Sequence, residues 1–378
     1  MIKLYDKSKI NKEDLLFSGK TLQMLLVPLV IEQLLNSFMG MVDTMMVSNV
    51  GSAAISAVSL VDSINTLVIQ VFAAMATGAT IICSQYIGSK NHEGCNRAAR
   101  QIVLTVVTIA LALSILCIGF RKPLLRLIFG AIEPEVMRAA QVYFFITVLS
   151  YPFIALFDAG SAFYRASGDA KYPMKISVIS NILNIAGNAF LIFGLDMGVE
   201  GAAISTLVSR IFCTVVVFYQ LSKPRQEIVL NDYLSIRPDF PLIVKILAVG
   251  VPSGIENGMF QFGKLAIQST VSTLGTAAIA AQAMTIIFEN VNGVAGIGIG
   301  IGLMTVVGQA IGAGRKEEAK YYIVKLSLYA EVAVLLSCLF VFALAKPAMW
   351  LAGMEAESAA LCFQMMIAIT IAKPLVWV

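Results

Sequence analysis

Residues 51–57 read GSAAISA, and residues 275–281 read GTAAIAA, 224 positions further along the chain. The same shift brings other residues into register on both sides of this stretch without a gap. The matched positions include Pro28 with Pro252, Glu32 with Glu256, Gly78 with Gly302, Gln85 with Gln309, and Lys122-Pro123 with Lys346-Pro347. In an apolar chain Leu and Ala coincide by composition, but Pro, Glu, Gln and Gly rarely do so. The sequence is therefore built from two related halves.

Both halves are strongly apolar. Of the 378 residues, 58% are hydrophobic and 13% are charged, whereas a soluble domain carries about 25% charged residues. Ten apolar runs are long enough to cross a bilayer, and without water only a helix satisfies their backbone groups. These runs are residues 21–47, 53–88, 99–120, 138–162, 173–195, 199–221, 241–272, 276–312, 320–345 and 357–378. We predict an all-α integral membrane protein.

The two halves predict a bundle of two lobes. The copies begin six spans apart, an even number, so both enter the membrane in the same orientation, a plan found in secondary transporters. Residues equivalent to the last two spans of the first half are missing after Val378, so we expect ten of twelve helices and a truncated second half. The expected parts are a cytoplasmic N-terminal segment (1–20), an N-lobe (21–221), a cytoplasmic linker (222–240) and a C-lobe (241–378).

Lysine and arginine indicate the orientation. They gather in the N-terminal segment and in the loops after the second, fourth, sixth and eighth spans, although residues 121–138 break this pattern. The positive-inside rule then predicts a multi-pass protein of the plasma (inner) membrane with a cytoplasmic N-terminus. The net charge of +4 fits this distribution, so we expect no nucleic-acid partner. The six cysteines are scattered without CxxC spacing, which gives no sign of disulfides or zinc.

Ionisable residues inside the spans are the first functional candidates, because each costs at least ~2.5 kcal/mol at the centre of a bilayer. On the first span, Glu32, Asn36 and Asp43 share one face of a helix. Glu256 is the repeat counterpart of Glu32, so we expect the two glutamates to flank the lobe interface symmetrically. The expected substrate cavity comprises Glu32, Gln33, Asn36, Glu256, Asn257, Gln261, Lys264 and Glu289. The alternative is structural, since Asn in membrane helices often only bonds a neighbouring helix.

The sequence offers little for catalysis. It contains no Ser/His/Asp set, paired-carboxylate motif or metal-ligand spacing, and its one histidine, His92, lies in a charged loop. The glycines between Gly293 and Gly302 lie within a span and follow no strand, unlike those of a nucleotide-binding loop. We therefore expect a protein that is not an enzyme and that binds no cofactor.

Several stretches resemble the multidrug and toxic compound extrusion (MATE) family, and together they extend over essentially the whole chain. They are residues 41–47 (MVDTMMV), 78–88, 165–174 (RASGDAKYPM), 181–194 and 198–206 (GVEGAAIST). The resemblance, to NorM-like and DinF-like bacterial members, implies twelve helices in two six-helix lobes. It also implies export of cationic or aromatic drugs and toxic compounds by antiport with Na⁺ or H⁺, through alternating access between the lobes.

The resemblance further implies where the coupling ion binds. The residues at the positions of the family's N-lobe cation site are Asp43, Asn184, Asn188 and Thr206. This set would hold Na⁺ if the protein is sodium-coupled. Some members carry Asp at the position of Asn188, so Asp43 is the one carboxylate of the set here. In the C-lobe, Phe260 stands where NorM-like members have Glu, and Glu256, one turn earlier, is a candidate substitute.

Three other interpretations stay open on the sequence alone. A lipid-linked oligosaccharide flippase of the related superfamily would need a larger and more cationic cavity than these acidic spans indicate. An integral membrane enzyme acting on lipids would need clustered His, Asp or Arg at one membrane face. The missing spans also allow a non-functional truncated transporter. For the favoured transporter, we expect small organic cations and the lipid bilayer as partners, and a monomer.

Overall fold

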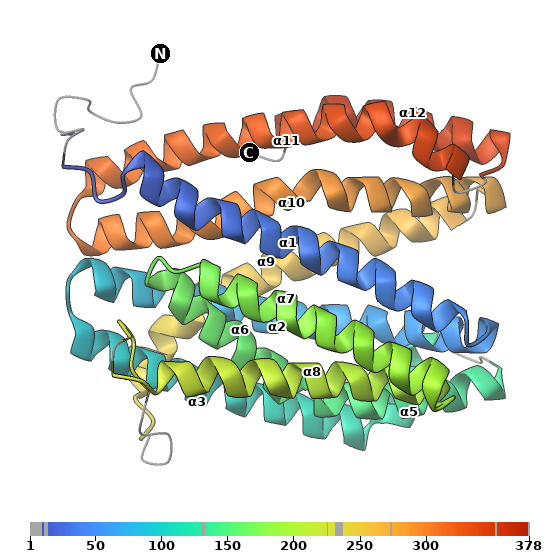
Figure 1. The fold of residues 1–378 in the computed structure, drawn as a ribbon, viewed down its shortest axis with the longest axis horizontal. Helices are drawn as coiled ribbons and strands as arrows, with labels where there is room; N and C mark the ends of the chain where they lie inside the picture. Colours follow the sequence, from blue (N-terminus) through green and yellow to red (C-terminus); the bar gives the residue numbers. More distant parts are fainter. Residues whose placement is uncertain are drawn as a thin grey trace.

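The computed structural model describes residues 10, 14–129, 133–224, 226–230, 237–272, 274–351 and 354–376. All regular structure within these residues is helical (Figure 1). The elements are α1 (Gly19–Ser48), α2 (Ser52–Gly88), α3 (His92–Gly119), α4 (Arg121–Phe129), α5 (Pro134–Leu149), α6 (Tyr151–Ala166), α7 (Lys171–Asn188), the π-helix η2 (Ala189–Gly194), α8 (Gly198–Leu221), α9 (Phe240–Ser272), α10 (Thr276–Gly312), α11 (Lys316–Leu351) and α12 (Ala356–Val376).

The apolar runs of the sequence are helices in the structure. Nine helices of the described part are long and apolar enough to cross a membrane, and α5 with α6 makes a tenth if the bent pair counts as one span. The prediction of an all-helical membrane protein is therefore confirmed. α3 begins earlier than its apolar run because Asn91 caps its polar first turn, accepting a hydrogen bond from the Gly94 N–H at 2.8 Å.

The fourth predicted span, residues 138–162, is bent by 42° where α5 meets α6. The bend lies at Ser150, two residues before Pro152, whose ring nitrogen has no proton to continue the helical hydrogen bonds. Arg210 of α8 reaches this break and donates from Nη1 to Ser150 Oγ at 2.6 Å. The Val148 carbonyl, which Pro152 leaves without its helical donor, accepts from Ser114 Oγ of α3 at 3.3 Å, so neighbouring helices supply hydrogen bonds at the bend.

The basic segment after the third span contains a helix that periodicity did not predict. In α4, Leu125 is buried while Lys122 and Arg126 are exposed. The Arg121 guanidinium lies 5.3 Å from the centroid of the Phe145 ring on α5. Arg121, Lys122 and Arg126, three of the charges that break the positive-inside pattern, therefore lie on a short surface helix, while Arg138 lies on α5.

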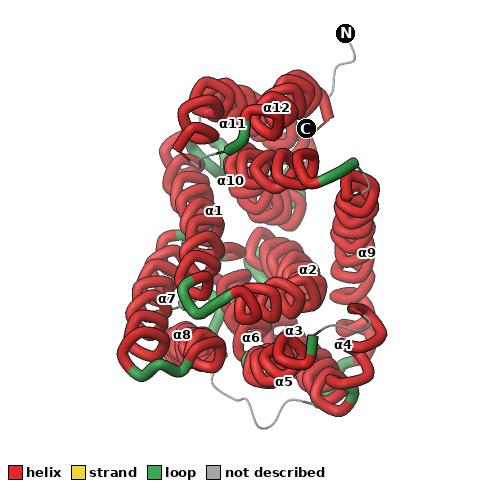
Figure 2. The backbone as a smooth tube through the Cα atoms, turned by 90° about the vertical axis from the view of Figure 1, so that its right-hand side faces the viewer, coloured by secondary structure: helices red, strands yellow, loops and turns green. Residues whose placement is uncertain are grey.

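The helices form two groups that are bridged by α1 and α9. Figure 2 shows α2, α3 and α5 to α8 on one side and α10 to α12 on the other, with α1 and α9 at opposite flanks. α1 packs against both α7 and α10, and α9 packs against α2. The start of α1, at Leu22, Leu25 and Leu29, shares a core with α10 and α11. The lobe boundaries at 21–221 and 241–378 stay a prediction, as do the segments 1–20 and 222–240, parts of which lie outside the described residues.

The internal repeat appears in space as a matched contact between α2 and α10. A Cβ atom at Gly88 would collide with the backbone carbonyl of Gln309, and one at Gly312 would collide with that of Gln85. These two contacts exchange under the shift of 224 positions. Gln309 Nε2 also donates to the Ala166 carbonyl of α6 at 2.6 Å. The two groups of helices are therefore in close backbone contact at this end of the bundle.

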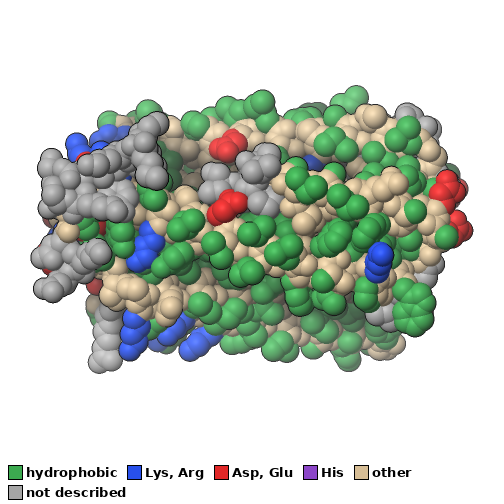
Figure 3. Space-filling model, turned by 90° about the horizontal axis from the view of Figure 1, so that it is seen from above, with side chains coloured by type: hydrophobic (Ala, Val, Ile, Leu, Met, Phe, Trp, Pro, Cys, Tyr) green, Lys and Arg blue, Asp and Glu red, His purple; other side chains and the backbone are tan. Residues whose placement is uncertain are grey.

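The surface fits a protein that lies in a bilayer. Figure 3 shows hydrophobic side chains along the length of one face, while Lys and Arg gather at the end where α1 begins in Figure 1. At that end the segment before α1 is attached to α11. The Leu16 N–H donates to Glu318 Oε1 at 2.6 Å, and the Phe17 N–H donates to Tyr322 Oη at 2.8 Å. Residues 1–9 and 11–13 of the predicted N-terminal segment lie outside the described residues.

Candidate functional site

The four residues of the predicted ion site lie together in the structure. Asn188 Nδ2 on α7 donates to Asp43 Oδ1 on α1 at 2.7 Å, and also lies 3.3 Å from Asn184 Oδ1 one turn earlier. The Asn184 side chain lies 3.2 Å from Thr206 Oγ1 on α8. Turning the Asn184 amide over places its nitrogen 2.9 Å from Asp43 Oδ1 and lets its oxygen accept from Thr206. We call Asp43, Asn184, Asn188 and Thr206 the Asp43 cluster.

The Asp43 cluster is rich in oxygen atoms that can bind a cation. It offers the carboxylate of Asp43, two amide oxygens and one hydroxyl, which are the hard donors that small cations prefer. Asn188 Oδ1 is buried and has no hydrogen-bond partner among the described residues. A buried acceptor without a donor is costly, and a cation would satisfy it.

Local packing holds the Asp43 cluster in place. Asn184 and Asn188 are one helical turn apart, so both side chains face α1 and α8. Ser205 of α8 donates to the Asn184 carbonyl at 2.8 Å and occupies the space that a side chain at Gly187 would need. The π-helix η2 begins directly after Asn188. Such wide turns inside membrane helices are frequent at functional sites.

A second polar network lies on α2 beside the first, with Asp62 at its centre. Asp62 Oδ1 accepts from Asn65 Nδ2 at 3.2 Å and from Tyr143 Oη of α5 at 3.3 Å. Tyr151 Oη of α6 donates to Asn65 Oδ1 at 2.8 Å. Arg210 is close enough to both Asp43 and Asp62 to interact with them electrostatically. A hollow of about 320 Å³ opens beside Asp62, lined by Val47 of α1 and one face of α2.

Tyr143, Tyr151 and Arg210 are functional candidates that the sequence reasoning did not select. Arg210 lies in the middle of the expected span 199–221, so the rule for ionisable residues in lipid applies to it as much as to the acids. The same rule covers Asp158 of α6, which interacts electrostatically with Arg165 and Arg210. The two tyrosines carry no such signal, because Tyr in a membrane span is usual.

Glu32 does not form the symmetric pair with Glu256 that the repeat predicts. It is 4% exposed, its Oε1 lies 3.9 Å from Arg165 Nη1, and Ser177 Oγ lies 3.5 Å from the same oxygen. Glu256 is exposed on α9. The two glutamates differ in their neighbours, because Arg165 of α6 and Ser177 of α7 lie against Glu32. Glu32 and Glu256 therefore lack the equivalent surroundings that a symmetric arrangement requires.

The other cavity candidates of the second half lie on α9 and α10. Lys264 Nζ lies 4.9 Å from the centroid of the Phe260 ring on the same helix. The backbone carbonyl of Glu289 accepts a hydrogen bond from Lys373 Nζ of α12 at 2.8 Å. Lys373 is buried and is a further ionisable residue that the sequence reasoning did not select.

The remaining four candidates of the expected cavity are not gathered at one place. They belong to α1 and α9, which stand on opposite flanks of the bundle in Figure 2. Gln33, Asn257 and Gln261 are half-buried, and Asn36 is exposed. The structure therefore brings together the predicted ion site but not the predicted substrate cavity.

Comparison with known proteins links both halves of the chain to one family. The model of the family described as MatE matches residues 28–190 and 252–376. The two matched segments begin 224 residues apart, as the internal repeat predicts.

Individual relatives and solved structures agree with this match. The chain is 29% identical over 317 residues to the "Probable multidrug resistance protein NorM" of Thermotoga maritima, covering 82% of this chain and 67% of that protein. It is 29% identical over 313 residues to the "Uncharacterized transporter YisQ" of Bacillus subtilis, covering 81% and 68%. A solved outward-facing multidrug resistance MATE family transporter superposes with a TM-score of 0.84 at 21% identity, covering 95% of this chain and 79% of that one. This last likeness shows the fold.

Proposed function

The chain belongs to the MatE family, and from this membership we propose that it is a secondary transporter that exports cationic or aromatic compounds by antiport with Na⁺ or H⁺. Membrane transport of the multidrug efflux class is what the family match and the curated relatives support. A third relative, from Mus musculus, is named "Multidrug and toxin extrusion protein 2" and is 26% identical over 82% of this chain and 53% of that protein. The substrate, the coupling ion and the transport cycle are the proposed part.

The observation that carries the proposal is the Asp43 cluster. One carboxylate, two amides and a hydroxyl from three helices converge in a half-buried place, and one buried amide oxygen has no donor. A carboxylate away from water is stabilised by a bound cation or a proton, and is costly without either. Binding of Na⁺ or H⁺ to Asp43 is therefore the event that we assign to the ion gradient.

The hollow beside Asp62 is the place that we assign to the positive group of the substrate. Asp43 and Asp62 are near enough to interact electrostatically, and Arg210 interacts with both. A cation or proton that neutralises Asp43 therefore weakens the negative potential at Asp62. An organic cation bound there loses affinity when the coupling ion arrives, which gives exchange of one for the other.

Alternating access is the motion that we propose for this exchange. α1 carries Asp43 at one end of its length, while Leu22, Leu25 and Leu29 near its start pack with α10 and α11. α1 therefore connects the ion site with the opposite group of helices. The contact of Gly88 with Gln309, and of Gly312 with Gln85, closes one end of the bundle. We place this end in the cytoplasm, since Lys and Arg gather there (Figure 3).

Efflux from proteoliposomes tests the proposed function. The purified protein is reconstituted with a fluorescent organic cation inside, and either a Na⁺ gradient or a pH gradient is imposed. Efflux faster than in protein-free vesicles, driven by one of the two gradients, is the expected result. Equal leakage with and without both gradients, at verified protein incorporation, would overturn the proposal. Transfer of a labelled lipid-linked oligosaccharide in the same vesicles would instead favour a flippase.

A further inference from the structure

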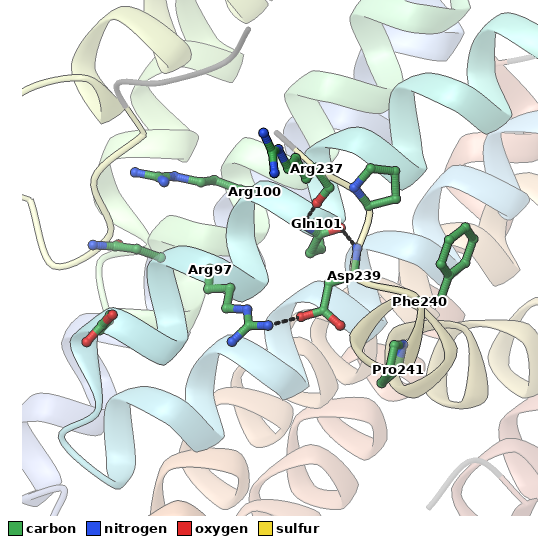
Figure 4. Close-up of a pocket in the computed structure, with 10 residues that line it drawn as sticks. Arg97, Arg100, Gln101, Arg237, Asp239, Phe240 and Pro241 are labelled. Carbon is green, nitrogen blue, oxygen red and sulfur yellow. Dashed lines mark hydrogen bonds and ion pairs between the residues drawn. The ribbon is translucent and has the colours of Figure 1, made fainter. Parts of the chain in front are cut away.

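Three arginines surround a cavity of about 810 Å³ outside the site described above. Figure 4 shows it between the first turns of α3, which carry Arg97 and Arg100, and the segment that leads into α9, which carries Arg237. The cavity lies at the basic end of the bundle, where α3 begins and α9 begins. Its further lining residues are Glu93, Asn96, Gln101, Pro238, Asp239, Phe240 and Pro241.

The frame of this cavity is fixed by polar contacts. Gln101 is buried and holds the entering segment at two points: its Nε2 donates to the Arg237 carbonyl at 2.8 Å, and its Oε1 accepts from the Asp239 N–H at 3.0 Å. Arg97 pairs with the Asp239 carboxylate at 2.5 Å. Gln101, Arg97 and Asp239 are therefore held in place by the protein itself before any ligand binds.

Two of the three guanidinium groups remain available for an anion. No carboxylate of the described residues lies within ion-pair distance of Arg100 or Arg237, whereas Arg97 is paired with Asp239. Arg100 Nε is buried and has no hydrogen-bond partner among these residues. Guanidinium groups bind phosphate oxygens with paired, charge-assisted hydrogen bonds. Because the Glu93 and Asp239 carboxylates also line the cavity, its three arginines leave one net positive charge, and Arg100 and Arg237 are the groups that can bind a phosphate.

An apolar stripe leads from the cavity along α9. Phe240, at the rim, is 71% exposed, and Val244, one turn later, is 63% exposed. Val251 and Ile255 continue the same side of the helix at 49% and 58% exposure. Residues spaced by 4, 11 and 15 positions point in nearly the same direction from an α-helix. An acyl chain can therefore lie along α9 while a charged headgroup occupies the cavity.

We propose that this cavity binds the phosphate headgroup of an anionic phospholipid, with its acyl chain along the Phe240–Val244–Val251–Ile255 side of α9. A basic pocket at the membrane boundary, open to an apolar helix face, is the arrangement that selects such lipids. The bound headgroup lies between α3, which carries Arg100, and the segment before α9, which carries Arg237. The lipid thus links the helices of the first half to the first helix of the second half.

Lipid binding to the detergent-solubilised full chain tests the proposal. Bound lipid is counted by native mass spectrometry during titration with phosphatidylglycerol, with phosphatidylcholine as the neutral comparison. The wild type is expected to prefer phosphatidylglycerol. The double variant R100Q/R237Q, which leaves the Arg97–Asp239 pair intact, is expected to lose about tenfold in affinity for each guanidinium contact removed.

A matched variant and a soluble competitor make the outcome decisive. K122Q/R126Q removes the same charge from exposed positions of α4 and is expected to bind phosphatidylglycerol like the wild type. An unchanged thermal unfolding curve of R100Q/R237Q in lipid-free detergent shows that the variant is folded. Equal binding of both lipids, or equal affinity of wild type and R100Q/R237Q, would overturn the proposal. Displacement of the lipid by millimolar pyrophosphate would also overturn it, since the cavity would then be a site for soluble phosphates.

Discussion

Asn188 of α7 donates its side-chain amide to Asp43 of α1, with 2.7 Å between Nδ2 and Oδ1. The two residues are 145 positions apart, so the bond ties helices that the chain itself does not place together. A cation at Asp43 must share this carboxylate with Asn188 or turn the amide so that its buried oxygen faces the ion. In the proposed function, ion binding at Asp43 would therefore change how α1 is held against α7, and α1 reaches both groups of the bundle.

Substitution of Thr206 by Val should weaken the binding of the coupling ion without unfolding the protein. Val keeps the shape of Thr but removes Oγ1, which lies 3.2 Å from the Asn184 side chain. One lost contact of about 1.4 kcal/mol raises the ion concentration for half-maximal efflux by about tenfold. The measurement is the initial efflux rate against the size of the imposed ion gradient.

Thr108→Val is the control for this prediction, since Thr108 lies on α3, away from the Asp43 cluster, and its hydroxyl donates to the Leu104 carbonyl of its own helix. It should leave the ion dependence unchanged. If efflux by Thr206→Val depended on the ion gradient as efflux by the wild type does, Thr206 would not be a ligand of the coupling ion.

Substitution of Tyr151 by Phe should destabilise the network around Asp62. Tyr151 is fully buried, and its hydroxyl donates to Asn65 Oδ1 at 2.8 Å. The variant leaves that buried oxygen without its donor, which costs about 1–3 kcal/mol of the free energy of unfolding. Denaturant titration in detergent measures this loss. Tyr219→Phe, at a side chain that is 67% exposed, should change the free energy by less than about 0.5 kcal/mol. If Tyr151→Phe and Tyr219→Phe had the same free energy of unfolding, the hydrogen bond from Tyr151 to Asn65 would not stabilise the protein.

Substitution of Gly88 by Ala should open the closed end of the bundle. The added methyl group would collide with the Gln309 carbonyl, so α2 and α10 must separate there. Maleimide labelling of a Ser84→Cys reporter measures the opening, because Ser84 is buried and the six native cysteines are buried too. An overpacking cost of about 1–3 kcal/mol predicts labelling that is roughly fivefold to a hundredfold faster. Gly119→Ala, where the new methyl group meets open space, should label like the parent. If Gly88→Ala and Gly119→Ala were labelled at the same rate, the close contact between Gly88 and the Gln309 carbonyl would be contradicted.

The membrane helices and the repeat were predictable because their signals are local or periodic. Apolar runs fix the spans, and the shift of 224 positions needs only the sequence itself. The bend at Ser150 could also be anticipated from Pro152 nearby. The Asp43 cluster was predictable because each member is a polar residue in a span and the family resemblance names its position. The structure adds that these four side chains are within hydrogen-bonding distance of one another.

The parts that the sequence did not predict depend on packing between distant helices. Tyr143 and Tyr151 meet Asp62 and Asn65 across 81 and 86 residues, and nothing in an apolar span distinguishes these tyrosines from packing residues. The burial of Glu32 follows from α6 and α7 closing over it. The internal repeat pairs Glu256 with Glu32 in the sequence, but it carries no information on the neighbouring helices that make their surroundings different.

The most direct test of the central claim is gradient-driven efflux by Asp43→Asn. Asn keeps the size of Asp and an oxygen for the Asn188 amide, so the variant should purify as a folded protein with the thermal unfolding curve of the wild type. Its initial rate of fluorescent-cation efflux from proteoliposomes is compared with and without the gradient that drives the wild type. The proposed role of Asp43 predicts that the gradient no longer accelerates efflux. Acceleration equal to that of the wild type would contradict it.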